Sequence, residues 1–289
     1  MDESLRHKLL TMQEGEITEH EVYKALARRE KDPANRRTLE RIAEDERRHS
    51  EFWASHTEVK CSPRAATVWK FRILSWLCGL TFTIKLMERG EENAQDEYQE
   101  IVQQIPEAAA VLADEESHEQ ELVAMIDEER LRYVGSIVLG LSDALVELTG
   151  ALAGLTLALQ NSRLIAAIGL ITGVAAAMSM AASEYLSTKA EDTQQKSAIK
   201  SAVYTGSAYI VTVAILIAPF LLLANPLLAL ALTVTGALLI IFVFVYYVSV
   251  ARDLPFWRRF GEMAVLSLGV AAVSFAIGYV VRFIFGVDV

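Results

Sequence analysis

The sequence predicts an all-α protein with two parts, a soluble helical domain over residues 1–130 and a membrane domain of five helices over residues 131–289. The first observation is the charge, because residues 1–130 carry 29 acidic and 18 basic side chains, whereas residues 131–289 carry 8 and 9. The second is the 51-residue stretch 201–251, which has no charged side chain and is too long and apolar for a soluble domain. The net charge of −10 argues against nucleic-acid binding.

The first part is expected to hold four long helices, because its pattern is helical throughout and no run alternates as a strand would. Proline-containing breaks fall at Asp32-Pro33, near Ser62-Pro63 and at Pro106. The predicted helices cover residues 3–30, 34–58, 66–104 and 107–130. Four helices with polar residues facing inward favour a four-helix bundle that holds a metal.

Two absences in the sequence limit the kind of metal site and the location of this domain. Cys61 and Cys78 form no CxxC pair, so a four-cysteine metal site and a disulfide framework are excluded. The N-terminal residues do not combine a basic start with an apolar core, so no cleavable signal is expected. The first domain is therefore expected to stay in the cytoplasm.

An internal repeat marks the four predicted helices. The first and third each carry a Gly-Glu pair with a tyrosine seven residues after the glutamate, and the second and fourth each carry Glu-x-x-His. In chain order the repeated residues are Gly15, Glu16 and Tyr23; Glu46 and His49; Gly90, Glu91 and Tyr98; Glu115 and His118. A single Glu-x-x-His in a glutamate-rich helix is typical of a solvated surface. Two Glu-x-x-His motifs that alternate with two Gly-Glu motifs along the chain favour a shared site.

Each Glu-x-x-His places a carboxylate and an imidazole on one face of a helix. Two facing pairs, with one glutamate from each other helix, make four carboxylates and two histidines, which is the ligand set of di-iron bundles. The predicted metal ligands are Glu16, Glu46, His49, Glu91, Glu115 and His118. Glu88, on the face of Glu91, is a candidate seventh ligand, although Gln13 occupies its place in the repeat. His7, His20 and His56 are interpreted as surface or packing residues.

Five stretches of the second part can cross a bilayer, since ~20 helical residues span ~30 Å of hydrocarbon. They are residues 133–159, 164–186, 202–223, 227–250 and 263–281. Basic residues at the junctions predict the direction by the positive-inside rule. Eight lie on the side of the first domain and two on the other: Arg130, Arg132, Lys189, Lys196, Lys200, Arg252, Arg258 and Arg259 against Arg163 and Arg282. The prediction is a multi-pass cell-membrane protein with its N-terminus in the cytoplasm and its C-terminus outside.

One apolar segment in the first part does not fit a soluble surface. Residues 73–84 contain no charged side chain, with Arg72 before them and Lys85 after them. Twelve residues are too few to span a bilayer. The segment is predicted to form a buried or interfacial helix.

Three acids lie where a membrane makes them unfavourable, at ~2.5–3.5 kcal/mol each near the bilayer centre. Asp143 and Glu147 share a face of the first span, and Met180 and Glu184 have the same spacing on the second. Carboxylates with a soft thioether favour a borderline divalent ion such as Fe²⁺. The alternative is that Glu184 reaches the interface and Met180 is ordinary packing. Glycines and alanines crowd both spans, which permits close helix packing, and no GxxxxGK[ST] motif supports an ATP-driven pump.

These motifs resemble known families. The segments GEITEHEVY, EDERRH, MERGEENAQDEY and DEESH resemble the rubrerythrin branch of the ferritin-like superfamily. The segments GLSDALVELTGALAGL and AAMSMAASEYLS resemble the first two spans of the vacuolar iron transporter family, and Pro219 fits its third span. Their order in one chain resembles the membrane-bound ferritin proteins, in which a rubrerythrin-type domain precedes a transporter domain.

The resemblance implies that the six predicted ligands bind a di-iron centre, with manganese as the alternative metal. It also implies that Asp143 and Met180 line an Fe²⁺/H⁺ exchange path across a homodimer, with Glu184 near its cytoplasmic mouth. The chain departs from these families at two points. It lacks the four-cysteine centre that often delivers electrons in rubrerythrins, and its connection between the second and third spans is too short for the acidic insert of plant transporters.

The leading hypothesis is a homodimer in the lipid bilayer that exports Fe²⁺, or Mn²⁺, from the cytoplasm in exchange for protons. Its soluble domain would capture, sense or oxidise iron, and Asp143, Glu147, Met180 and Glu184 would relay the ion. The competing hypothesis is an enzyme, a ferroxidase or peroxide-consuming di-iron protein with a membrane anchor. A third treats the soluble domain as a regulator that gates the transporter.

Overall fold

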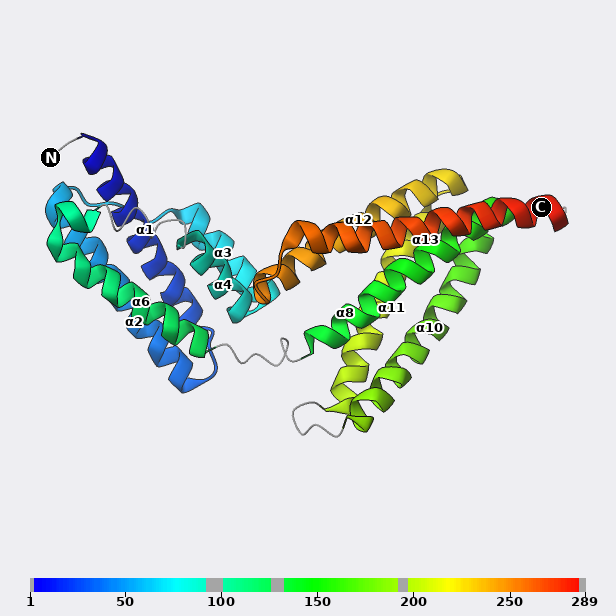
Figure 1. Ribbon diagram of the computed structural model, residues 1–289, viewed down its shortest axis with the longest axis horizontal. Coiled ribbons are helices and arrows are strands. Elements are labelled where there is room, and N and C mark those ends of the chain that lie inside the picture. Colours follow the sequence, from blue (N-terminus) through cyan, green and yellow to red (C-terminus); the bar gives the residue numbers. More distant parts are fainter. Residues whose placement is uncertain (1–2, 92–100, 126–132, 192–196, 286–289) are drawn as a thin grey trace. The chain divides into compact units, whose positions relative to one another are not determined.

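The computed structural model describes residues 3–91, 101–125, 133–191 and 197–285, and all regular structure in these ranges is helical (Figure 1). The chain divides into unit 1, Met1–Glu128, and unit 2, Glu129–Val289. The helical content confirms the predicted all-α class for the described residues.

Unit 1 is built from long helices whose ends follow local sequence signals. Its elements are α1 (Glu3–Ala27), α2 (Pro33–Thr57), α3 (Ala65–Cys78), α4 (Leu80–Glu91), η1 (Pro106–Ala108) and α6 (Ala109–Ala124). Asp32 accepts hydrogen bonds from the backbone N–H groups of Ala34 and Asn35, and Pro33 is the first helical residue of α2. A side-chain cap followed by proline is a strong helix start, so the predicted break at Asp32-Pro33 is confirmed.

The predicted single helix over residues 66–104 is interrupted at Gly79. This glycine has a φ of 92° and separates α3 from α4. A side chain at that φ would be strained, so only glycine breaks the helix there at little cost. The prediction was wrong at this point because Gly79 lies inside an apolar run that reads as continuous helix.

Two hydrophobic clusters fill the interior of unit 1, one toward each end of α1. In the first, Tyr23 and Leu26 of α1 meet Ile42 of α2, Ile84 of α4 and Leu122 of α6. In the second, Leu9 of α1 meets Trp53 of α2 and Val111 of α6. The glutamates and histidines of the repeat fall between these clusters along each helix, so a polar layer lies between two apolar ones.

Unit 2 contains five helices long and apolar enough to cross a membrane, which confirms the predicted number within the described residues. The first consists of α8 (Val134–Asp143), the π-helical turn η2 (Ala144–Leu148) and α9 (Thr149–Leu159). The others are α10 (Ser162–Ala190), α11 (Ala198–Leu222), α12 (Pro226–Ala251) and α13 (Phe256–Phe285). Asn161 and Asn225 cap α10 and α12 through their side chains, in two of the gaps between the predicted spans.

Small residues permit close contact between helices in unit 2. A Cβ atom on Gly278 of α13 would collide with the carbonyl oxygen of Gly154 of α9, and one on Gly140 of α8 would collide with that of Thr205 of α11. Small residues that let backbones meet are the usual means of helix association in membranes. These contacts hold α8 and α9 against α11 and α13.

Candidate metal centre

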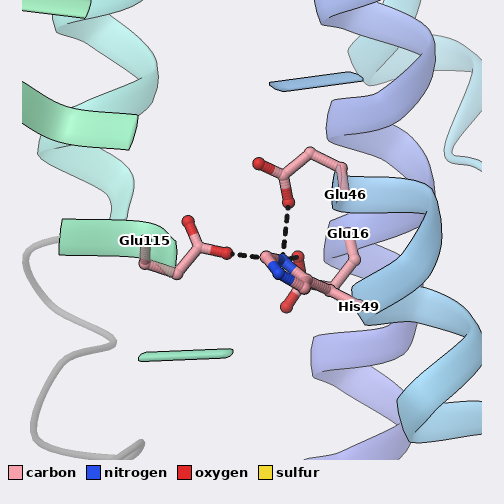
Figure 2. A group of neighbouring side chains, drawn as sticks. All are labelled: Glu16, Glu46, His49 and Glu115. Atoms are coloured by element: carbon pink, nitrogen blue, oxygen red, sulfur yellow. Dashed lines mark ion pairs between the residues drawn. The ribbon is translucent and has the colours of Figure 1, made fainter. Parts of the chain in front are cut away.

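Three helices bring a group of metal-ligating side chains together in the polar layer of unit 1. Glu16 lies on α1, Glu46 and His49 on α2, and Glu115 on α6 (Figure 2). One ligand atom of each lies within 4.8 Å of the others. Ligand atoms of a bound divalent ion such as Zn²⁺ lie ~2.0–2.2 Å from it, and so up to ~4.4 Å apart. The spacing therefore fits a metal ion after only a small contraction.

The distances show that two of the carboxylates face both histidines. The Nδ1 atom of His49 lies 3.5 Å from Glu46 Oε2 and 3.0 Å from Glu115 Oε1. The Nδ1 atom of His118 lies 3.3 Å from Glu46 Oε1 and 3.8 Å from Glu115 Oε2. Each glutamate thus turns one oxygen toward each imidazole, and the two ring centroids are 5.8 Å apart. Glu16 completes the group, with its Oε2 3.7 Å from His49 Nδ1.

The facing atoms are buried, and several lack hydrogen bonds. Within the described chain no hydrogen bond reaches Glu46 Oε2, His49 Nδ1, Glu115 Oε1 or His118 Nδ1. Buried polar atoms are usually satisfied, and leaving one unsatisfied destabilises the fold by about 1–3 kcal/mol. Oxygen and imidazole nitrogen are common ligands of iron and manganese, so the donor set fits the predicted metal.

The charged side chains of this polar layer shift the pKa values of their neighbours. Burial, with the neighbouring charges of Glu115 and Glu16, raises the pKa of Glu46 well above its usual range. Burial works against protonation of His49, but the facing carboxylates of Glu115, Glu16 and Glu46 outweigh it and raise the pKa of His49. Both shifts favour bound protons in this layer. A divalent cation supplies the same positive charge and would release protons on binding.

Two aspartates that the sequence analysis overlooked orient the histidines. The Nε2 atom of His118 lies 3.2 Å from Asp45 Oδ2, and that of His49 lies 3.3 Å from Asp114 Oδ2. Each aspartate directly precedes a ligand glutamate, so the repeat is Asp-Glu-x-x-His and each aspartate contacts the histidine of the other helix. The contact of each aspartate with Nε2 turns Nδ1 of that ring toward the facing carboxylates. Carboxylate partners commonly orient metal-bound histidines in this way.

Glu16 is held in place by a residue of the apolar layer beside it. The indole N–H of Trp53 donates a hydrogen bond to Glu16 Oε1 over 3.1 Å, and both side chains are buried. Glu16 Oε2 is then the oxygen that faces His49. The hydrogen bond from Trp53 thus leaves Oε2 as the Glu16 oxygen that faces the cluster.

Some predicted residues of the repeat lie elsewhere or beyond the described part. Glu88 and Glu91 belong to the last turns of α4, but their side chains fall outside what the structure describes, as does Tyr98. Tyr23 packs in the hydrophobic core. His20 is buried and its Nδ1 lies 2.5 Å from the Ala43 carbonyl oxygen, in agreement with a packing role.

The membrane acids form two separate polar contacts in unit 2. Ser136 Oγ donates a hydrogen bond to Glu184 Oε1 over 2.6 Å, and the Tyr209 hydroxyl donates to Glu147 Oε2 over 3.3 Å. Asp143 and Met180 are half-buried. No hydrogen bond among the described residues joins the acids of the first span to Met180 or Glu184. A cavity of about 470 Å³ adjoins Glu147 and Tyr209 and is otherwise lined mainly by apolar and small residues.

The π-helical turn η2 begins directly after Asp143 and contains Glu147, where the sequence predicted regular α-helix. Its Leu145 carbonyl oxygen accepts a hydrogen bond from Ser267 Oγ of α13 over 2.8 Å. Single π-turns are frequent at functional sites because they free backbone groups and change the direction of nearby side chains. No local residue signals this turn, since its stabilising partner is distant in the sequence.

Comparisons with known proteins add evidence for unit 2. Residues 134–200 match the model of the VIT family. The match covers the first two spans and the start of the third, including Asp143, Glu147, Met180 and Glu184. With the five helices it indicates a multi-pass membrane protein and favours a membrane transporter of metal ions. No curated protein and no solved structure matches the chain.

Proposed function

We propose that the chain forms a homodimeric membrane transporter that exports Fe²⁺, or Mn²⁺, from the cytoplasm in exchange for protons. The observation that carries this proposal is the VIT family match across the two spans that contain the membrane acids. The excess of basic residues at one set of junctions supports a cytoplasmic unit 1. Export then delivers the ion to the side opposite the metal centre.

The membrane acids supply the ion path in this proposal. Asp143 directly precedes the π-turn and Glu147 lies within it, whereas Met180 and Glu184 lie on the second span. Each carboxylate releases a proton when the cation arrives and regains one when it leaves, which couples metal movement to proton movement. The hydroxyl groups of Tyr209 and Ser136 keep Glu147 and Glu184 hydrogen-bonded between these events. A dimer supplies a second copy of each ligand.

Unit 1 is proposed to hold a dinuclear iron centre in a ferritin-like bundle. Glu46 and Glu115 each direct one oxygen to His49 and one to His118, so these four residues would hold the pair of metal ions. Glu16 would add a ligand beside His49, and Glu91 is its predicted counterpart. The centre gives the protein a place to capture, sense or oxidise Fe²⁺ before export.

Ion flux in proteoliposomes tests the transport proposal. Fe²⁺ and Mn²⁺ uptake is measured with and without a pH difference, for the wild type, Asp143→Asn and Glu262→Gln. Glu262 is an exposed acid at the start of α13 that pairs with Arg258, so its neutralisation serves as a matched control. We expect Asp143→Asn to abolish flux and Glu262→Gln to retain it. Equal flux in both variants contradicts the path.

A membrane-anchored ferroxidase or peroxidase is the second candidate function. It is favoured by the centre itself, since α1, α2 and α6 of unit 1 provide Glu16, Glu46, His49, Glu115 and His118. Glu46→Gln separates the candidates in the full chain. If the protein is chiefly an enzyme, this variant loses Fe²⁺-dependent peroxide consumption and the wild type shows no flux. If unit 1 only regulates, the variant changes the Fe²⁺ concentration at which flux begins.

A further inference from the structure

Helix α3 presents large apolar side chains to the outside of unit 1. Trp69, Trp76 and Leu77 are 67%, 68% and 56% exposed, and no residue of this helix is fully buried. Trp69 and Trp76 are seven residues apart, so they lie on the same side of the helix two turns from each other. Soluble surfaces rarely expose two neighbouring tryptophans, and such a face usually marks an interaction site.

The opposite side of α3 fixes the direction of this face. Val68 and Phe71 pack against the hydrophobic cluster of α1, α2, α4 and α6. Arg29, in the turn after α1, donates a hydrogen bond from Nη1 to Ser75 Oγ over 3.2 Å. These contacts hold the helix against the unit. The exposed tryptophans are therefore a fixed surface of unit 1 and not a loosely attached segment.

The charge around α3 is opposite to that of the rest of unit 1. Residues 59–87 contain no acidic side chain and five basic ones, whereas residues 1–130 as a whole carry 29 acids and 18 bases. Lys70 and Arg72 lie between the two tryptophans in the sequence and are exposed. Neither forms an ion pair with a residue that the structure describes. Their charge is thus available to an anionic partner.

The combination of tryptophan, leucine and basic side chains is the composition of helices that lie in a membrane surface. Tryptophan favours the headgroup region, where its ring is partly buried and its N–H meets water. Each basic residue near an anionic leaflet adds ~1 kcal/mol of attraction. A second copy of the chain is a poorer partner, because a two-fold interface would bring Lys70 and Arg72 toward their own equivalents.

The short connection between the units limits how far unit 1 can lie from a bilayer that unit 2 spans. Unit 2 carries the five membrane-capable helices, and only eight peptide steps separate Met125 from Tyr133. Eight steps extend at most ~30 Å, whatever path they take. Docking is then an intramolecular event with a high effective concentration, so a modest affinity is sufficient.

We propose that α3 is a membrane-interface helix whose Trp69–Trp76 face docks unit 1 onto the anionic headgroups of the bilayer that unit 2 spans. The proposal depends on unit 2 being in a membrane and not on which ion is transported. It gives unit 1 one preferred face toward the lipid.

Tryptophan quenching in nanodiscs tests this proposal on the full chain. Trp257 of unit 2 is exposed, so all proteins carry Trp257→Phe, and buried Trp53 remains as an internal reference. A second protein also carries Trp69→Phe and Trp76→Phe. The fluorescence of α3 is obtained by subtracting the emission of this second protein from that of the first. Discs contain equal parts of brominated phosphatidylglycerol and phosphatidylcholine, and acrylamide reports access from water. We expect strong quenching by the brominated lipid and weak quenching by acrylamide.

Charge reversal provides the second arm of the test. Lys70→Glu with Arg72→Glu removes two attractive charges. Each lost charge should lower the ratio of docked to undocked unit 1 about fivefold, so the double variant should lower it at least about 25-fold. Arg6→Glu with Arg37→Glu makes the same change in net charge at exposed sites of α1 and α2 and should leave lipid quenching unchanged.

Three outcomes overturn the proposal. Quenching by acrylamide without quenching by brominated lipid would show that α3 faces water. Protection from both quenchers would show that protein covers it, as a second copy would. Equal lipid quenching in both charge-reversed proteins would show that anionic headgroups are not what α3 recognises.

Discussion

The two orienting aspartates differ in burial, and this difference predicts how much each supports metal binding. Asp45 and Asp114 lie 3.2 and 3.3 Å from the Nε2 atoms of His118 and His49. Their side chains are 8% and 52% exposed, respectively. Water screens the charge of Asp114 but hardly that of Asp45. The same substitution should therefore have unequal effects on two histidines in similar positions.

Asp45→Asn should weaken metal binding about tenfold, the lower end of the range for outer partners of metal ligands, because asparagine still accepts a hydrogen bond but carries no charge. This corresponds to about 1.4 kcal/mol. Asp114→Asn should change the affinity less than about threefold, in keeping with the small free energies of exposed ion pairs.

Asp45 also pairs with Arg41 and Arg48, and these contacts need a control. Both arginines are substantially exposed, so their ion pairs should contribute at most about 1 kcal/mol. Arg48→Gln breaks one of them without touching His118 and should leave metal affinity nearly unchanged.

The assay is competition between the full-length protein in nanodiscs and a chromophoric chelator for Mn²⁺, which avoids oxidation. Circular dichroism of each variant confirms that the helices remain. Equal losses in Asp45→Asn and Asp114→Asn would refute the reasoning from burial. A loss in Arg48→Gln as large as that in Asp45→Asn would assign the effect to the ion pairs instead.

Three further changes test other parts of the structure. Glu46→Gln should reduce the number of bound metal ions, since Glu46 faces both histidines. Glu14→Gln, which breaks an exposed ion pair with Arg64, should not change that number. The metal content of each variant is measured after dialysis. Gly278→Ala should destabilise unit 2 by about 1–3 kcal/mol, because the added methyl group collides with Gly154. Gly236→Ala should not, because no atom lies within 4 Å of the added methyl group. Thermal unfolding in detergent compares the two variants. Ser267→Ala removes the hydrogen bond to Leu145 and should lower the free energy of unfolding by about 0.6 kcal/mol. Thr235→Ala is the control, because this exposed hydroxyl bonds to Ala231 within its own helix.

The parts of the structure that the sequence could predict are those set by local spacing. The helix start at Asp32-Pro33 depends on side chains next to it, and the number of spans depends on apolar length. The ligand group of unit 1 was also predictable, because Glu46 and His49 must share a helix face and the motif recurs with Glu115. The structure brings five of the six predicted ligands together; the side chain of Glu91 lies outside its described part.

The parts that could not be predicted depend on contacts between distant residues. The π-turn is accompanied by a hydrogen bond from Ser267, which lies 122 positions after Leu145 in the sequence. The roles of Asp45 and Asp114 need the crossing of α2 and α6, although their place before each ligand glutamate was a visible signal. The break at Gly79 was hidden because glycine is tolerated within helices, and only its φ of 92° distinguishes it.

The acids of unit 1 and those of unit 2 differ in how tightly they should hold a metal ion. In unit 1, Glu46 and His49 are buried, and oriented imidazoles strengthen the site, so a bound ion should leave slowly. In unit 2 the acids have neutral hydroxyl partners, Ser136 and Tyr209, and Glu147 is exposed, so these sites should bind more weakly. Rapid transport requires weak sites, because an ion held tightly at any step limits the rate. Under the proposed function, the unit 1 centre is therefore better suited to sensing or oxidising iron than to serving as a step on the path, and an ion bound there should exchange more slowly than one transport cycle.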